Sequence, residues 1–382
     1  MASSGNHHPL IMNTSQAHRA TSVHDQRVGE DGGVDLRHHG DAEVAPGMVD
    51  LAVNVRTGMP PGWLRQRLAS AIDGIATYPD ARPAADAIAG RHGRSVDDVL
   101  PTAGGAEAFT LLARALRPGV DVRRPVVVHP QFTEPEAALG AAGHGVERVI
   151  LSADDGFRLR PEHVPGDADL VVVGNPTNPT SVLHPADVLT GLARPGRILV
   201  VDEAFMDAVP AEPESLAGRP DIPGLVVLRS LTKTWGLAGL RAGYVAGPEP
   251  IIRALRQVQP PWSVSSLAVE AIQACVEPAA VAEAERLARA DAPVRERLTS
   301  ELRRLGGQVV PHPRAPFVLV RFDDGDRLRQ LLRDLGWALR RGDTFPGLGP
   351  EWMRIALRDE PTMNRFVARL GAVLHRDGHQ AE

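Results

Sequence analysis

The feature that most constrains the fold of this chain is a series of short, unbroken runs of Val, Leu and Ile. Four of them, "RRPVVVHP", "ADLVVVGNP", "GRILVVDEAF" and "GLVVLRS", lie between residues 123 and 230. Strands that are buried on both faces carry such runs, whereas strands with one wet face alternate. Helix-like segments such as "EPEAALGAAG" and "PADVLTGLARPG" separate them. The pattern predicts an α/β protein whose mostly parallel sheet is covered by helices.

The length of 382 residues allows one large domain and one smaller domain. An amphipathic segment over 278–306 predicts a long helix that Pro293 kinks or divides. After it the order becomes strand, helix, strand, helix, which favours a second domain. We therefore expect a disordered lead-in over 1–36, an N-terminal arm over 37–70, a large ligand-binding domain over 71–285 and a small C-terminal domain over 286–382.

Composition excludes several classes of function. The 42 basic and 47 acidic residues are dispersed along the chain, which argues against nucleic acid as a partner. The single cysteine, Cys275, excludes a disulfide scaffold and a cysteine-based zinc site, and no metal site is predicted. The polar N-terminal stretch does not resemble a signal peptide, and no run reaches about 18 apolar residues. We expect a cytoplasmic protein without membrane contact.

Lys233 is the only lysine in a chain whose other basic side chains are Arg or His. Arginine stays protonated, whereas a desolvated lysine can lose its proton and form a Schiff base. The alternative is a surface lysine without a role. Nearby, Ser230, Thr232 and Arg241 offer the hydroxyl and guanidinium groups that bind phosphate. The segment therefore predicts a nucleophilic amine beside a phosphate site.

Two further strand ends carry polar residues. Asp202 follows the run "ILVV", and its carboxylate could pair with a protonated pyridine nitrogen. The alternative for Asp202 is a structural acid, which is the stronger reading for its neighbour Glu203. Asn178 lies in the turn "GNPTNPTS" after another run and could donate to a ring oxygen, unless this turn is purely conformational. Ligands bind at such carboxyl ends in parallel sheets.

Lys233 in "SLTKTWGLAGLRAGY", Asp202 in "DEAF" and Asn178 in "NPTNPT" together resemble the fold-type I pyridoxal-phosphate enzymes of the class I/II aminotransferase group. The resemblance runs from about residue 38 to about residue 375. It implies that pyridoxal 5'-phosphate is the cofactor, held on Lys233 in the large domain. It also implies a second, smaller α/β domain at the C-terminus.

The resemblance assigns further residues one at a time. Phe132 occupies the position of the aromatic ring that stacks on the cofactor, and Arg354 that of the arginine that binds the substrate α-carboxylate. Tyr78 resembles a tyrosine that reaches the phosphate in the neighbouring subunit, which implies a homodimer with shared active sites. "TAGGAEAF" resembles the turn whose backbone N–H groups hold the cofactor phosphate, around Gly105, Ala106 and Glu107.

Within the group, the sequence most resembles the cobalamin-pathway branch that includes threonine-phosphate decarboxylases, and next the histidinol-phosphate aminotransferases. "RHHGD", "DEAF" with Phe205, and "LRRGDTFPGL" carry this likeness. The branch usually shows Asn-x-Asn-Pro where this chain has "NVRTGMPP", so Asn54 matches but Arg56 does not. Arg56 adds a cation near the substrate entrance and puts the substrate in doubt. Candidates for a distal anion pocket are His38, His39, Arg340 and Arg341.

We therefore expect an enzyme that acts on an amino acid or amine through an external aldimine. The leading hypothesis is decarboxylation of a phosphorylated amino acid such as threonine phosphate, with Lys233 and Asp202 as catalytic residues. Alternatives are amino transfer of the histidinol-phosphate type, or a secondary-metabolism reaction that forms C–C or C–N bonds or replaces a β- or γ-substituent. A non-catalytic binding protein is also conceivable, but it would not need a Schiff-base lysine.

Overall fold

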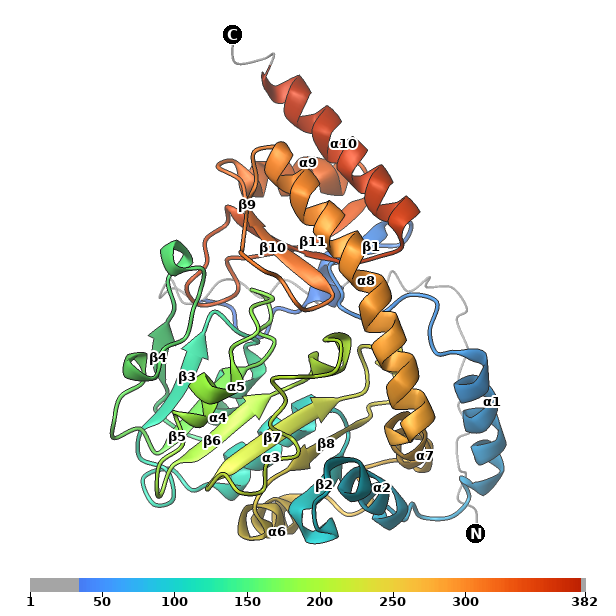
Figure 1. The fold of residues 1–382 in the computed structure, drawn as a ribbon, viewed down its shortest axis with the longest axis vertical. Helices are drawn as coiled ribbons and strands as arrows, with labels where there is room; N and C mark the ends of the chain where they lie inside the picture. The colour runs from blue at the N-terminus through green and yellow to red at the C-terminus, as the bar shows by residue number, and fades with distance from the viewer. Residues whose placement is uncertain (1–33, 379–382) are drawn as a thin grey trace, which may run out of the picture. The chain divides into compact units, whose positions relative to one another are not determined.

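Seven strands form the larger of two sheets in the computed structural model, which describes residues 34–378 (Figure 1). Their order is β2-β8-β7-β6-β5-β3-β4, and all pairs are parallel except those made by β8. The predicted mostly parallel sheet is thus confirmed. The strands are β2 (Val99–Thr102), β3 (Pro125–His129), β4 (Glu147–Ile150), β5 (Leu170–Gly174), β6 (Ile198–Asp202), β7 (Leu225–Ser230) and β8 (Gly243–Ala246).

The three central strands end together at one edge of this sheet. In their register Gly174 lies opposite Asp202, and Asp202 lies opposite Leu228. Because β5, β6 and β7 run parallel, the segments that follow them emerge side by side. The Val and Leu side chains between these ends are almost completely buried, as their unbroken apolar runs predict.

Helices flank the large sheet and bury its side chains. α3, α4 and α6 share one apolar cluster with the sheet, in which Phe109 and Leu112 of α3 pack with Val200 and Leu228. A second cluster joins α2 and α7 to β8 through Tyr244 and Trp235. These helices are α1 (Gly62–Ala71), α2 (Arg82–His92), α3 (Gly105–Ala115), α4 (Glu134–Ala141), α5 (Ala186–Thr190), α6 (Glu249–Val258) and α7 (Ser266–Val276).

The second sheet has the order β1-β11-β12-β10-β9 and packs on α8, α9 and α10 (Figure 1). Its first strand comes from the predicted N-terminal arm, because Val49 pairs with Trp337 in parallel. The elements are β1 (Val49–Leu51), α8 (Pro278–Arg304), β9 (Gln308–Val309), β10 (Phe317–Arg321), α9 (Gly325–Asp334), β11 (Trp337–Arg341), β12 (Trp352–Ala356) and α10 (Glu360–Gly378).

α8 is a single helix of 27 residues that contains Pro293, so the proline does not divide it. It contacts β9 and β10 of the second sheet. It also contacts α7 and the short helix η6 (Met206–Ala208), which follow strands of the large sheet in the sequence. The predicted domain limits at 70 and 285 stay predictions. The predicted disordered lead-in lies almost wholly in residues 1–33, outside the described residues. No helix within residues 34–378 is long and apolar enough to cross a membrane.

Candidate active site

A cavity of about 590 Å³ opens where β5, β6 and β7 end, and the second sheet closes it from the other side. β12 brings Arg354 to it, and β11 brings Arg340. The structure therefore gathers residues that are up to 315 positions apart in the sequence. The predicted residues that line it are His39, Asn54, Gly105, Ala106, Phe132, Asn178, Asp202, Ser230, Thr232, Lys233, Arg241, Arg340 and Arg354.

Lys233 lines this cavity, with its Nζ 5.9 Å from the centre of the Phe205 ring. Burial, together with the positive charges of Arg354 and Arg241, lowers the pKa of Lys233 to about 8. A low pKa matters because only the neutral amine is nucleophilic. Near pH 8 about half of the molecules thus carry a lysine able to attack a carbonyl carbon.

Asp202 ends β6 on the same side of the cavity. Burial raises the pKa of Asp202 to about 6, against the lowering effect of the Ala204 N–H, which donates to its Oδ1 at 3.0 Å, and of Lys233. At neutral pH the carboxylate is still mainly ionised, and it can pair with a protonated ring nitrogen. Glu203 has the structural role expected of it, since it pairs with Arg229 at 2.9 Å in the protein interior.

A glycine turn precedes α3. Gly104 has φ +79°, a conformation that favours glycine, and the backbone N–H groups of the first turn of α3 begin at Gly105. A Cβ at Gly104 would lie 2.6 Å from Nη2 of Arg241, so the guanidinium packs directly against the turn. The hydroxyls of Ser230 and Thr232 lie 2.7 Å apart on the same wall. This cradle suits a phosphate.

Two arginines form the opposite wall. Arg354 and Arg340 are directly paired across β12 and β11. Arg354 donates to Oδ1 of Asn178 at 2.6 Å and to the carbonyl of Ala52. Its pKa is held well below the usual range by burial and by Arg340 and Arg358. Since the Asn178 oxygen accepts from Arg354, its NH₂ end is left to donate to a ligand.

Arg340 donates to the carbonyl of His38 at 2.8 Å and stacks on Phe345, with 4.6 Å to the ring centre. Its buried Nη1 lies 3.8 Å from the Glu43 carboxylate as an ion pair but makes no hydrogen bond within residues 34–378. Both polar side-chain atoms of Asn54 are buried and also make no hydrogen bond within these residues. A buried polar group without a partner is costly, and a ligand that binds in this cavity can satisfy it.

Five predicted site residues do not line this cavity. The side chain of Glu107 accepts from the Ala103 N–H at 2.6 Å and so holds the glycine turn, while the role of its backbone N–H at a phosphate stays a prediction. His38 pairs with Glu43 at 2.9 Å, and Arg341 pairs with Asp343. Arg56 pairs with Asp291 on α8 and lines a neighbouring cavity that also reaches Lys233. Tyr78 is the fifth.

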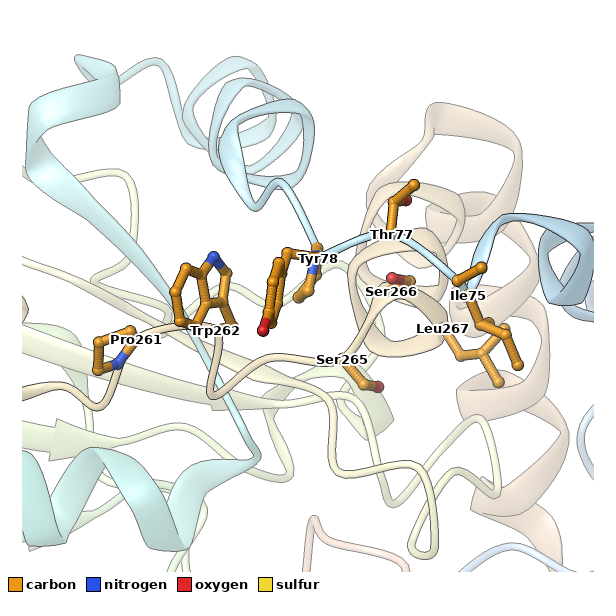
Figure 2. Close-up of a pocket in the computed structure, with 10 residues that line it drawn as sticks. Ile75, Thr77, Tyr78, Pro261, Trp262, Ser265, Ser266 and Leu267 are labelled. Carbon is orange, nitrogen blue, oxygen red and sulfur yellow. The ribbon is translucent and has the colours of Figure 1, made fainter.

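Tyr78 lies on the outside of the chain, where 75% of its surface is exposed. It stacks on Trp262, with 4.2 Å between the ring centres, and both line an open hollow with Ile75 and Leu267 (Figure 2). The tyrosine is thus not part of the site built by its own chain.

Asp41, Gln131 and Glu134 are polar cavity residues that the sequence analysis does not predict. Glu134 pairs with His39 at 2.8 Å, and the buried Gln131 donates to the carbonyl of Val172. Asp41 belongs to the "RHHGD" segment, in which the sequence analysis predicts only the two histidines as ligand-binding residues. Phe132, which lies between Gln131 and Glu134 in the sequence, also lines the cavity, and its ring centre is 5.8 Å from that of His39.

Residues 46–370 match the family described as aminotransferase class I and II. The chain belongs to this family. It is a pyridoxal-phosphate-dependent enzyme, as expected from the lysine, aspartate and asparagine motifs. A histidinol-phosphate aminotransferase of Mycobacterium tuberculosis is 51% identical over 85% of this chain and 87% of its own length. A threonine-phosphate decarboxylase of Salmonella typhimurium is 31% identical over 86% and 91%.

The fold agrees with the family. The histidinol-phosphate aminotransferase from Clostridium acetobutylicum superimposes with a TM-score of 0.77 at 23% identity, over 85% of this chain and 98% of its own. The residues present can hold the cofactor. The turn at Gly104 with Ser230 and Arg241 suits its phosphate, Lys233 its aldehyde carbon, and Asp202 its ring nitrogen.

Proposed function

We propose that this protein transfers an amino group to or from a phosphorylated amino compound of the histidinol-phosphate type. The observation that carries the proposal is the pair Arg340 and Arg354, which places two guanidinium groups across the cavity from the anion cradle. One anion site serves the cofactor, and the arginines serve a substrate phosphate or carboxylate. The curated relative at 51% identity, a histidinol-phosphate aminotransferase, supports the same substrate class.

When bound, pyridoxal phosphate supplies a ring that accepts electrons as a bond to the substrate carbon breaks. This chain's residues do the rest. The free amine of Lys233 would accept at Nζ the proton that the substrate carbon loses, and would donate that proton again as the amino group is transferred. The pKa of about 8 suits both steps near neutral pH. Asp202 would pair with the protonated ring nitrogen, and Asn178, whose oxygen accepts from Arg354, would donate from its NH₂ end to the ring oxygen.

Decarboxylation of O-phosphothreonine is the second candidate. The observation that favours it is Phe205, which presents an apolar ring 5.9 Å from the Lys233 amine instead of a hydroxyl group. A carboxylate held against an apolar surface is destabilised, which favours its loss as carbon dioxide. The relative at 31% identity is a threonine-phosphate decarboxylase.

One experiment separates the two reactions. The cofactor-loaded protein is incubated with histidinol phosphate plus 2-oxoglutarate and, separately, with O-phosphothreonine, and the products are identified by mass spectrometry. We expect glutamate in the first reaction. Carbon dioxide and the phosphorylated amine from the second, with no glutamate in the first, would replace the proposal by the decarboxylase. The Lys233→Ala variant, loaded in parallel, controls for reactions of free cofactor.

We further propose that two copies of the chain form a homodimer with shared active sites. Its support is the exposed apolar surface around Tyr78, which includes Trp262, Ile72 and Ile75, each half or more exposed. Apolar surface of this kind on a water-soluble chain is typical of an interface. In the dimer Tyr78 would reach the phosphate in the partner's cavity.

Mixed dimers test this sharing. Lys233→Ala and Tyr78→Phe preparations are assayed alone and after mixing and re-equilibration. If Tyr78 serves the partner's site, a mixed dimer contains one site with both residues intact, so activity rises above the sum of the two preparations. An unchanged sum in samples that light scattering shows to be mixed dimers would refute sharing, and a monomer would refute the dimer.

A further inference from the structure

His39, Gly40 and Asp41 form one wall of the active-site cavity, and the segment 38–43 that carries them is fixed at both ends. Arg340 of β11 donates to the carbonyl of His38, whose ring pairs with Glu43 at 2.9 Å. Glu43 is buried and also pairs with Arg329 of α9 at 3.3 Å. The ring of His39 pairs with Glu134 at the start of α4. The wall is therefore tied to elements of both sheets.

Gly40 lets this wall pass close to the rest of the site. A Cβ on Gly40 would lie 2.5 Å from the carbonyl oxygen of Ala52 and 3.6 Å from Nη2 of Arg354. No side chain fits at this position without displacing the backbone. The next residue, Asp41, is thus held at the cavity beside the arginine end, in the short helix η1 (Gly40–Glu43).

Asp41 stands out when the charges of the cavity are compared. Of the three acids that line it, Asp202 accepts from a backbone N–H and Glu134 pairs with His39. Asp41 is exposed, and among the described residues no hydrogen bond or ion pair engages its carboxylate. Its charge nevertheless acts on the amine of Lys233. A carboxylate so placed is ready to accept from a donor on a ligand.

We infer that Asp41 is a specificity-determining residue, which accepts a hydrogen bond from a cationic or N–H-bearing group of the substrate. The inference rests on the proposed function. Histidinol phosphate carries such a group in its imidazole ring, while its phosphate goes to the arginines. O-phosphothreonine has no second basic group and adds a carboxylate, which Asp41 repels. Asp41 thereby favours a phosphate ester with a basic ring over a phosphorylated amino acid.

The test compares wild type, Asp41→Asn and Asp35→Asn, each loaded with pyridoxal phosphate. Asp35 is an exposed acid six residues before Asp41 and outside the cavity, and its change alters the net charge equally. We measure kcat/KM for histidinol phosphate and, by calorimetry, the Kd of O-phosphothreonine. Asp41→Asn should lower kcat/KM about tenfold and leave the Kd unchanged or lower it, whereas Asp35→Asn should change neither.

The outcomes separate the inference from the function it rests on. Turnover of histidinol phosphate by wild type that Asp41→Asn leaves unchanged overturns the inference alone. If Asp41→Asn lowers kcat/KM for histidinol phosphate and the affinity for O-phosphothreonine by the same factor, the inference is also overturned. A matching loss of kcat/KM in Asp35→Asn overturns it as well, because both results indicate a general effect of charge or structure. Absence of histidinol-phosphate turnover by wild type overturns the proposed function and the inference with it.

Discussion

Lys233 should destabilise the folded, cofactor-free protein at neutral pH. Its pKa falls from 10.5 to about 8 because burial disfavours the charged form. Each unit is worth about 1.4 kcal/mol, so the ammonium form costs the folded state about 3 kcal/mol. Replacing Lys233 by Met, of similar length and without charge, removes this cost. The variant should unfold at a temperature several degrees higher than wild type at pH 7.

The pH dependence of this difference gives the sharper test. In a folded state with a lowered lysine pKa, the stability present above about pH 10.5 is lost as the pH falls to about 8. The advantage of Lys233→Met is therefore full below pH 8 and shrinks toward pH 10.5. Differential scanning fluorimetry of both apoproteins at pH 7, 8, 9 and 10 measures it, and other titrating groups cancel. A constant difference, or a less stable variant at pH 7, would refute the reasoning.

Three further predictions follow from the same geometry. Gly104→Ala places a methyl group against Arg241 at a backbone angle that favours glycine, so the Kd of pyridoxal phosphate, followed by absorbance, should rise at least tenfold. Glu203→Gln removes one of the two carboxylates that pair with Arg229 and leaves Glu212 as the other, so the free energy of unfolding should fall by about 2 kcal/mol, measured in urea. Arg354→Lys keeps the charge but loses the planar fork, so steady-state kinetics should show a higher KM for the amino substrate.

The sequence predicts the fold best where burial of apolar side chains alone determines a strand. β5, β6 and β7 are buried on both faces, so their apolar runs predict them directly, and the polar residues at their ends mark the cavity. β2 and β8 are equally buried but were not predicted. β2 has four residues including Pro101, and β8 begins with a glycine, so neither shows a long β-branched run. Their place depends on pairing with each other and, for β8, with β7.

The site was predicted unevenly for a related reason. Only a lysine side chain forms a Schiff base, and only a carboxylate pairs well with a protonated ring nitrogen. The residue types of Lys233 and Asp202 therefore predict their roles without knowledge of the fold. Arg341 and Arg56 are ordinary in type, and only the fold decides that they pair with Asp343 and Asp291 instead of lining the main cavity. Asp41 was overlooked because an acid on a short polar segment is common, and the contact of Gly40 with Ala52 is visible only in three dimensions.

That Lys233 is the only lysine gives the protein a property of practical use. Every other cationic side chain is Arg or His, so Lys233, at the cavity, is the only side chain that borohydride can trap as an imine, and an α-amino group is the only other kind of primary amine that competes with it. The mass added per chain then counts occupied sites directly. Sugars and aldehydes that modify exposed lysines elsewhere find no such side chain on this surface.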